Sequence, residues 1–125
     1  MLNKLSIGGT ANIRAVDETN FAVAMTGMFD GGVYAKTTKS NESVDGKKHY
    51  DLCHYFVTDD GSYLYTQDKS VHTPVEDTIY FAQTEYNVVK AGGKFEGLTG
   101  SFKSWGAIDY EKGVGVLRFE GQLTE

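Results

Sequence analysis

The chain has 125 residues, of which 40% are hydrophobic, 23% are charged and 15 are glycine, with a formal net charge of -5 at pH 7. This composition is that of one globular domain over residues 1–125, and it excludes disordered and collagen-like chains. The acidic balance argues against binding to nucleic acids or anionic membranes, because both kinds of partner need a cationic protein face.

Aromatic and β-branched residues recur in short runs between turn signals, which predicts an all-β protein. The predicted strands cover residues 2–14, 20–30, 47–58, 62–72, 77–90, 95–108 and 114–124, with an additional short strand near 33–38. A helix over residues 15–28 is disfavoured, because Phe21, Val23 and Met25 alternate with small residues. Residues 39–48 are polar without a hydrophobic period, and they predict a surface loop.

Antiparallel strands of this number and length form either a sandwich or a barrel. Closure into a barrel removes both exposed edges of a sheet, and the single proline of the chain leaves little to protect such edges. We therefore expect a closed antiparallel β-barrel of about eight strands.

The hairpin around Asp60-Gly61 decides which side chains face the barrel interior. A two-residue turn there pairs Asp59 with Ser62. The more apolar face, which we assign to the interior, then carries Tyr50, Leu52, His54, Phe56, Tyr63, Tyr65, Gln67 and Val71. The other face carries His49, Asp51, Cys53, Tyr55, Asp68, Ser70 and His72. A three-residue loop would shift the register by one and move the side chains of one strand to the opposite face.

A turn at Lys112-Gly113 assigns the faces of the last hairpin in the same way. The predicted inward residues are Phe102, Ile108, Leu117, Phe119 and Leu123, and the predicted outward residues are Trp105, Asp109, Arg118 and Glu120. In the segment 80–89, two faces compete, and we favour the one that turns Tyr86 inward.

Glycines mark the segment from Tyr86 to Gly100, YNVVKAGGKFEGLTG, in which Gly92-Gly93 precedes a basic-aromatic pair and a Gly-x-x-Gly follows. Asp60-Gly61-Ser62 lies upstream, and Arg118-Phe119-Glu120-Gly121 lies near the end of the chain. In this order, the C-terminal half resembles the allene oxide cyclase-like barrels. Residues 93–105 are most similar to the spirotetronate-forming cyclases, which are Diels–Alderases, within that family.

This resemblance implies an eight-stranded barrel, open at one end, whose lumen holds a mostly apolar small molecule. It also implies that no metal and no organic cofactor takes part. Enzymes of this type hold a flexible, reactive substrate in one conformation, and restricting its geometry supplies much of the rate acceleration. The glycines themselves have a structural meaning, because they permit turns and bulges.

His54 is the centre of the predicted site. An imidazole among phenols and an amide can polarise a carbonyl or move a proton. The alternative is that its neighbours only satisfy the hydrogen bonds of a buried histidine. We predict two catalytic residues, His54 and Tyr50, and four substrate-binding residues, Phe56, Tyr65, Gln67 and Tyr86.

Other constellations have less support. A shifted register would turn His49, Asp51, Cys53 and His72 inward, but His72 lies too far along its strand for a metal site with His49 and Asp51. Cys53 and His54 are consecutive strand residues and point to opposite faces, so they form no catalytic dyad. The carboxylates of Glu85 and Glu120 would be bases only if they faced the lumen.

Three functions follow from a barrel of this kind. The leading hypothesis is a cofactor-independent cyclase, isomerase or related lyase acting on an apolar substrate in the lumen. A carrier or sensor of a small apolar ligand is the second, and a structural barrel with a filled lumen is the third. Residues 1–7 lack the apolar run of a secretory signal, so we expect a cytoplasmic protein. Aromatic residues on both faces of several strands suggest a homodimer.

Overall fold

A computed structural model describes residues 3–26 and 31–125 of the chain. The first residue of the predicted strand 2–14 and the end of the predicted strand 20–30 lie outside these ranges. Within them, the strands are β1 (Lys4–Ile7), β2 (Thr10–Ala15), β3 (Asn20–Thr26), β4 (Gly31–Glu42), β5 (Lys48–Thr58), β6 (Tyr63–Glu76), β7 (Ile79–Gly92), β8 (Ser101–Asp109) and β9 (Val114–Thr124). A short 3-10 helix, η1 (Gly93–Phe95), separates β7 from β8.

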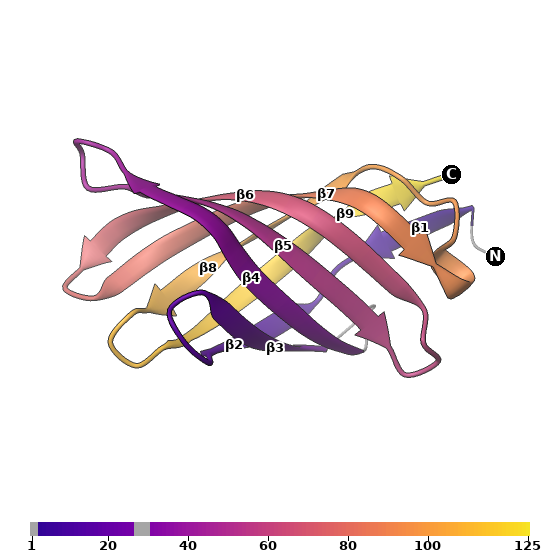
Figure 1. The fold of residues 1–125 in the computed structure, drawn as a ribbon, viewed down its shortest axis with the longest axis horizontal. Helices are drawn as coiled ribbons and strands as arrows, with labels where there is room; N and C mark the ends of the chain where they lie inside the picture. Colours follow the sequence, from indigo (N-terminus) through magenta and orange to yellow (C-terminus); the bar gives the residue numbers. More distant parts are fainter. Residues whose placement is uncertain (1–2, 27–30) are drawn as a thin grey trace.

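The strands form a closed antiparallel barrel, as predicted (Figure 1). The sheet runs in the order β1-β9-β2-β3-β4-β5-β6-β7-β8, and an additional pairing of β9 with β8 closes strands β2 to β9 into an eight-stranded cylinder. The extra strand β1 pairs with the C-terminal half of β9, whereas β2 pairs with its N-terminal half. The predicted strand 2–14 is therefore interrupted between β1 and β2, where Gly9 has a φ of 100°.

Three of the predicted boundaries are wrong by four or more residues, one of them because the strand predicted over 62–72 extends to Glu76. The strand expected near 33–38 extends to Glu42, because Asn41 pairs with His49 and Glu42 pairs with Lys48 in the β4–β5 hairpin. The loop predicted over 39–48 is therefore wrong for residues 39–42 and 48, because the backbone hydrogen bonds of a strand need no apolar side chains. The strand expected over 95–108 begins only at Ser101.

The connection between β7 and β8 contains η1 and the glycines expected to form turns. Gly93, Gly97 and Gly100 all have positive φ, at 65°, 87° and 121° respectively. This backbone folds back on the barrel and buries Phe95 and Leu98 in the core. No helix in the described part of the chain is long and apolar enough to cross a membrane.

The register of the β5–β6 hairpin differs from the predicted one. The Thr58 N–H donates to the Ser62 carbonyl oxygen at 2.9 Å, and the Gly61 N–H donates to the Thr58 carbonyl oxygen at 3.0 Å. The loop thus has three residues, Asp59 to Gly61, and Gly61 adopts a φ of 83°. The Asp60 carboxylate stabilises it by accepting hydrogen bonds from the Thr58 hydroxyl and the Ser62 N–H, and these bonds lower the pKa of Asp60.

The three-residue loop turns β6 over relative to β5. His54 pairs with Thr66 and Phe56 pairs with Leu64. The inward residues of β5 are those predicted, but the inward residues of β6 are Leu64, Thr66, Asp68, Ser70 and His72. The prediction that Tyr65 and Gln67 face the lumen is therefore wrong, because one extra loop residue exchanges the two faces of a strand.

The last hairpin has a longer turn than predicted but keeps the predicted faces. Asp109 pairs with Val114, so four residues form the turn instead of two. A register shift by two leaves each side chain on its face. Phe102, Phe119 and Leu123 are buried inside, and in β7 the face of Tyr86 is the inward one, as predicted.

One end of the cylinder is packed solid. It lies on the side of the chain termini and η1 in Figure 1. The Phe102 ring lies 4.7 Å from the Tyr86 ring and 5.6 Å from the Phe56 ring, measured between centroids. The buried residues around this end are Leu5, Ile7, Phe56, Leu64, Phe95, Leu98, Phe102, Phe119 and Leu123. We call this the packed end. The interior of the other end is less completely filled.

Candidate functional site

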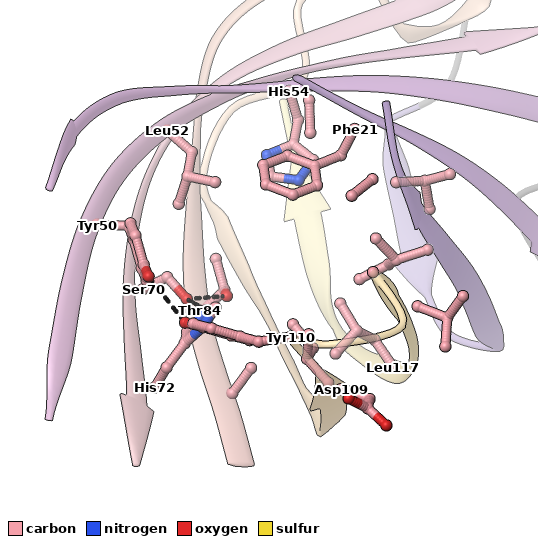
Figure 2. A pocket seen from close by; sticks show the side chains of 18 of the residues that line it. Phe21, Tyr50, Leu52, His54, Ser70, His72, Thr84, Asp109, Tyr110 and Leu117 are labelled. Atoms are coloured by element: carbon pink, nitrogen blue, oxygen red, sulfur yellow. Dashed lines mark hydrogen bonds between the residues drawn. The ribbon is translucent and has the colours of Figure 1, made fainter. Parts of the chain in front are cut away.

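A cavity of about 320 Å³ lies inside the barrel toward the β2–β3 and β8–β9 connections (Figure 2). We call this end of the barrel the mouth. The inward side chains of the alternating strands form its walls. The lining residues are Ile13, Ala15, Asp17, Glu18, Phe21, Val23, Ala35, Tyr50, Leu52, His54, Ser70, His72, Ala82, Thr84, Tyr86, Ile108, Asp109, Tyr110, Gly113, Val114 and Leu117. The lining is thus mainly apolar with a few hydroxyl, imidazole and carboxylate groups.

A buried histidine–carboxylate pair borders this cavity. His54 Nδ1 lies 2.5 Å from Asp68 Oδ2, and the two residues are 8% and 3% exposed. The pair forms because His54 lies opposite Thr66, which places Asp68, two residues along β6, on the diagonal. The contact with the Asp68 carboxyl group thus occupies Nδ1 of the ring. Nε2 is then the nitrogen available to a molecule in the cavity.

Aromatic rings hold the imidazole of His54 in place. The Phe56 ring stacks on it at 5.6 Å with an interplanar angle of 18°, and the Tyr86 ring meets it at 4.9 Å and 75°. The Tyr86 hydroxyl shares a hydrogen bond of 2.6 Å with Ser104 Oγ, and burial raises the pKa of this phenol, so it stays neutral. Nearby, Asp68 Oδ1 is buried with no hydrogen-bond partner. A carboxylate in such surroundings acts strongly on its one partner, because little solvent screens it.

A chain of hydrogen bonds covers one wall of the mouth. Tyr50 Oη lies 2.8 Å from Tyr110 Oη, which lies 2.6 Å from His72 Nδ1. His72 Nε2 lies 3.0 Å from Ser70 Oγ, which lies 2.7 Å from Thr84 Oγ1. We call these five residues the mouth network. Figure 2 shows them gathered on the side of the cavity away from His54.

The mouth network is uncharged at neutral pH. Burial, reinforced by the nearby Lys48 ammonium, lowers the pKa of His72 to about 4. Burial and the hydrogen bond with Tyr50 raise the pKa of Tyr110. The network therefore consists of neutral hydroxyl groups joined through a neutral imidazole, which has one N–H donor and one acceptor nitrogen.

Carboxylates, and no lysine or arginine, are found among the cavity-lining residues in the described part of the chain. Asp17 accepts hydrogen bonds from the backbone N–H groups of Thr19 and Asn20, which lower its pKa. Asp109, predicted to face outward, borders the cavity where β8 ends, and its pKa is lowered mainly by the hydrogen bond from the Thr78 hydroxyl. Both carboxylates thus stabilise the loops that frame the mouth.

The structure brings together only part of the predicted site. Tyr50, His54 and Tyr86 line the cavity, and Phe56 packs against the His54 ring without lining it. Tyr65 and Gln67 lie on the outer face.

The sequence interpretation named His72 as inward only under a shifted register, and that part of the alternative is confirmed. It missed Asp68, Ser70, Thr84 and Tyr110. The spacing of Asp68, Ser70 and His72, two residues apart on one strand face, was the available signal. Tyr110 lies in a turn, where strand alternation says nothing about direction.

The alternative constellations do not form. Asp51 lies on the outside in an ion pair of 3.0 Å with Lys69, and His49 Nε2 contacts Ser43 Oγ at 3.4 Å. Glu85 and Glu120 are exposed. Among residues 3–26 and 31–125, no group of three or more His, Cys, Asp or Glu side chains is arranged to hold a metal ion.

No protein-family model, curated protein or solved structure matches this chain. The resemblance to the allene oxide cyclase-like barrels therefore stays a prediction, and the function has to be argued from the site.

Proposed function

We propose that this protein is a cofactor-independent enzyme that isomerises or cyclises a small, mostly apolar molecule inside the barrel, or cleaves it as a lyase. His54 removes a proton from the substrate and returns it, and Asp68 orients the imidazole and stabilises its protonated form. The proposal extends the predicted catalytic role of His54 and keeps Tyr50 as a polar contact for the substrate. The chain's own side chains supply this chemistry.

The observation that carries the proposal is the buried contact of His54 with Asp68 at the edge of an apolar cavity. A carboxylate behind an imidazole fixes which nitrogen faces a substrate, and it favours the imidazolium that forms when a proton is taken up. The burial of His54 and Asp68 strengthens both effects, because little solvent screens the pair. A histidine with a purely structural role would also need a buried hydrogen-bond partner, so the feature that favours catalysis is that His54 lines the cavity as well.

A carrier of a small apolar ligand is the second candidate. The cavity and the mouth network would serve binding alone, without proton transfer. The cavity argues against the third hypothesis, a barrel whose lumen is filled by side chains, because about 320 Å³ is space for a small organic molecule. A cytoplasmic location and a homodimer stay predictions.

The two candidates are separated by a probe reaction that needs only a base in an apolar pocket. Nitrobenzisoxazole is neutral and flat, and it opens to a coloured phenolate when a base removes its ring proton. We expect the protein to accelerate this opening above the buffer rate, and His54→Gln to lower the acceleration by about 100-fold or more. Asp68→Asn should lower it as well, by leaving the imidazole without its carboxylate.

His49→Gln is the matched control, because His49 lies on the outer face of the same strand. It should leave the rate unchanged, and circular dichroism and the unfolding midpoint should show that each variant is folded. Probe binding by the wild-type protein without acceleration would support the carrier. An acceleration that survives His54→Gln would exclude His54 as the base.

A further inference from the structure

We infer that the ligand of this site is an elongated, non-anionic molecule with a carbonyl or hydroxyl group at one end and an apolar body. That end group binds Tyr50 of the mouth network, and the other end reaches His54. This inference rests on the proposed function in taking the same cavity as the site, and it adds the chemical class of the substrate.

The length of the ligand follows from the distance between the two polar side chains that it contacts, Tyr50 and His54. Tyr50 and His54 lie on the same face of β5 and are four residues apart. At the rise of a β-strand, their Cα atoms are roughly 13 Å apart. Figure 2 shows the two side chains on different sides of the cavity. A molecule that contacts both must therefore be extended.

The apolar body of the ligand follows from the side chains that line the cavity between Tyr50 and His54. Leu52 lies between Tyr50 and His54 on β5, and Phe21 and Leu117 line other walls of the cavity (Figure 2). These side chains offer no hydrogen bond to the middle of a ligand. A polar group there would lose its water without compensation, at a cost of about 1–3 kcal/mol.

The end group is not an anion, because the cavity lining offers no lysine or arginine as its counter-ion. The groups that meet it are hydroxyls joined through neutral His72. Asp17, Glu18 and Asp109 surround the same opening and repel anions. Lys48 contacts the mouth network, because its Nζ lies over the rings of Tyr110 and Tyr80, at 4.7 and 5.1 Å from their centroids. Lys48 itself does not line the cavity, and its ammonium group interacts with these two rings.

The mouth network can meet either a carbonyl or a hydroxyl group. If His72 carries its proton on Nδ1, it donates to Tyr110 Oη, the Tyr110 hydroxyl donates to Tyr50 Oη, and the Tyr50 hydroxyl can donate to a carbonyl oxygen. If the proton is on Nε2, every donor reverses, and Tyr50 Oη can accept from a ligand hydroxyl. His72 is thus a positioning residue that sets the direction of donation at Tyr50.

The test compares four probes of one chain length: octan-2-one, octan-1-ol, octanoate and octane, titrated at pH 7 and followed by protein NMR shifts. We expect the ketone and the alcohol to bind at least about 5-fold more tightly than octanoate. Tyr50→Phe should weaken the ketone and the alcohol by about 3- to 10-fold, since it removes one hydrogen bond, and should leave octane unchanged.

Tyr55→Phe is the control, because Tyr55 is an exposed tyrosine on the outer face of the same strand. It should change no affinity. Octanoate binding that equals or exceeds ketone binding and is lost in Lys48→Met would overturn the inference in favour of an anionic end group. An unchanged ketone affinity in Tyr50→Phe would overturn the role of the mouth.

These outcomes are independent of the proposed catalysis. His54→Gln should still prefer the ketone over octanoate, because it leaves the mouth network in place. If the probe reaction fails and the preference persists, the ligand class stands and the protein is a carrier. If the preference fails and the probe reaction succeeds, the enzyme stands and the ligand class is wrong.

Discussion

The two ends of the barrel are built from the same strands and differ in what fills them. At the packed end, inward positions carry Phe102, Phe119 and Leu123, which are at most 4% exposed. At the mouth, inward positions of the same sheet carry Tyr50 and His72, which are only partly buried. Burial of apolar surface stabilises the first end, whereas hydrogen bonds among neutral polar groups organise the second.

This difference shows how one barrel separates stability from chemistry. A packed core tolerates little change in volume, so it gives the strands fixed positions. Because the packed end supplies this stability, the mouth can contain a cavity and an imidazole–carboxylate pair, which add less packing energy than apolar side chains would. Tyr86 and His54 lie where the two regions meet, because the Tyr86 ring contacts both His54 and Phe102.

Truncating one phenylalanine at each end should change the free energy of unfolding more than any other substitution considered below. Phe102→Ala should lower the free energy of unfolding by about 3–5 kcal/mol, because it empties a closed site. Phe21→Ala should lower it by only about 1–2 kcal/mol, because Phe21 is partly exposed and already borders a cavity. Urea unfolding of both variants measures the difference. Equal losses would mean that the two ends are packed alike.

An intermediate effect is expected from pH. The pKa of His72 is about 4 in the folded chain and 6.5 in its ordinary state. Between these values the unfolded chain binds a proton that the folded chain excludes, so stability falls as the pH falls from 6.5 to 4. This one group should contribute about 2–3 kcal/mol to the loss.

His72→Gln should therefore lose less stability than the wild-type protein over that pH window, as measured by unfolding at each pH. His49→Gln controls for the loss of an imidazole as such, and should follow the wild-type curve. Parallel curves for His72→Gln and the wild-type protein would show that the mouth holds water around His72 and does not exclude its charge.

The smallest effect concerns the turn that sets the register of the mouth. Gly61→Ala should cost about 1 kcal/mol, because alanine disfavours a positive φ even though its Cβ meets no atom there. Gly32→Ala also meets no atom, and Gly32 has no positive φ, so it should be neutral or slightly stabilising. Equal unfolding midpoints for the two variants would contradict the turn geometry.

Predictions from the sequence succeeded where alternation alone decides the outcome. Phe56, His54 and Tyr50 share one face of β5 whatever strand lies beside it, and Phe102 and Phe119 remained inward although their turn is two residues longer than predicted. The faces of β6 were reversed, because Ser62 pairs with Thr58 instead of Asp59, which shifts the register by one residue. That reversal removed Tyr65 and Gln67 from the site and brought in Asp68.

Local alternation and the number of strands were enough to predict an all-β chain, to favour a barrel over a sandwich, and to turn His54 and Tyr50 inward. The contacts of Asp68 with His54, and of Tyr110 with Tyr50 and His72, became visible only in the folded chain. Such partners lie 14 to 60 residues apart in the chain, and their meeting depends on loop length and strand register, which no local pattern specifies.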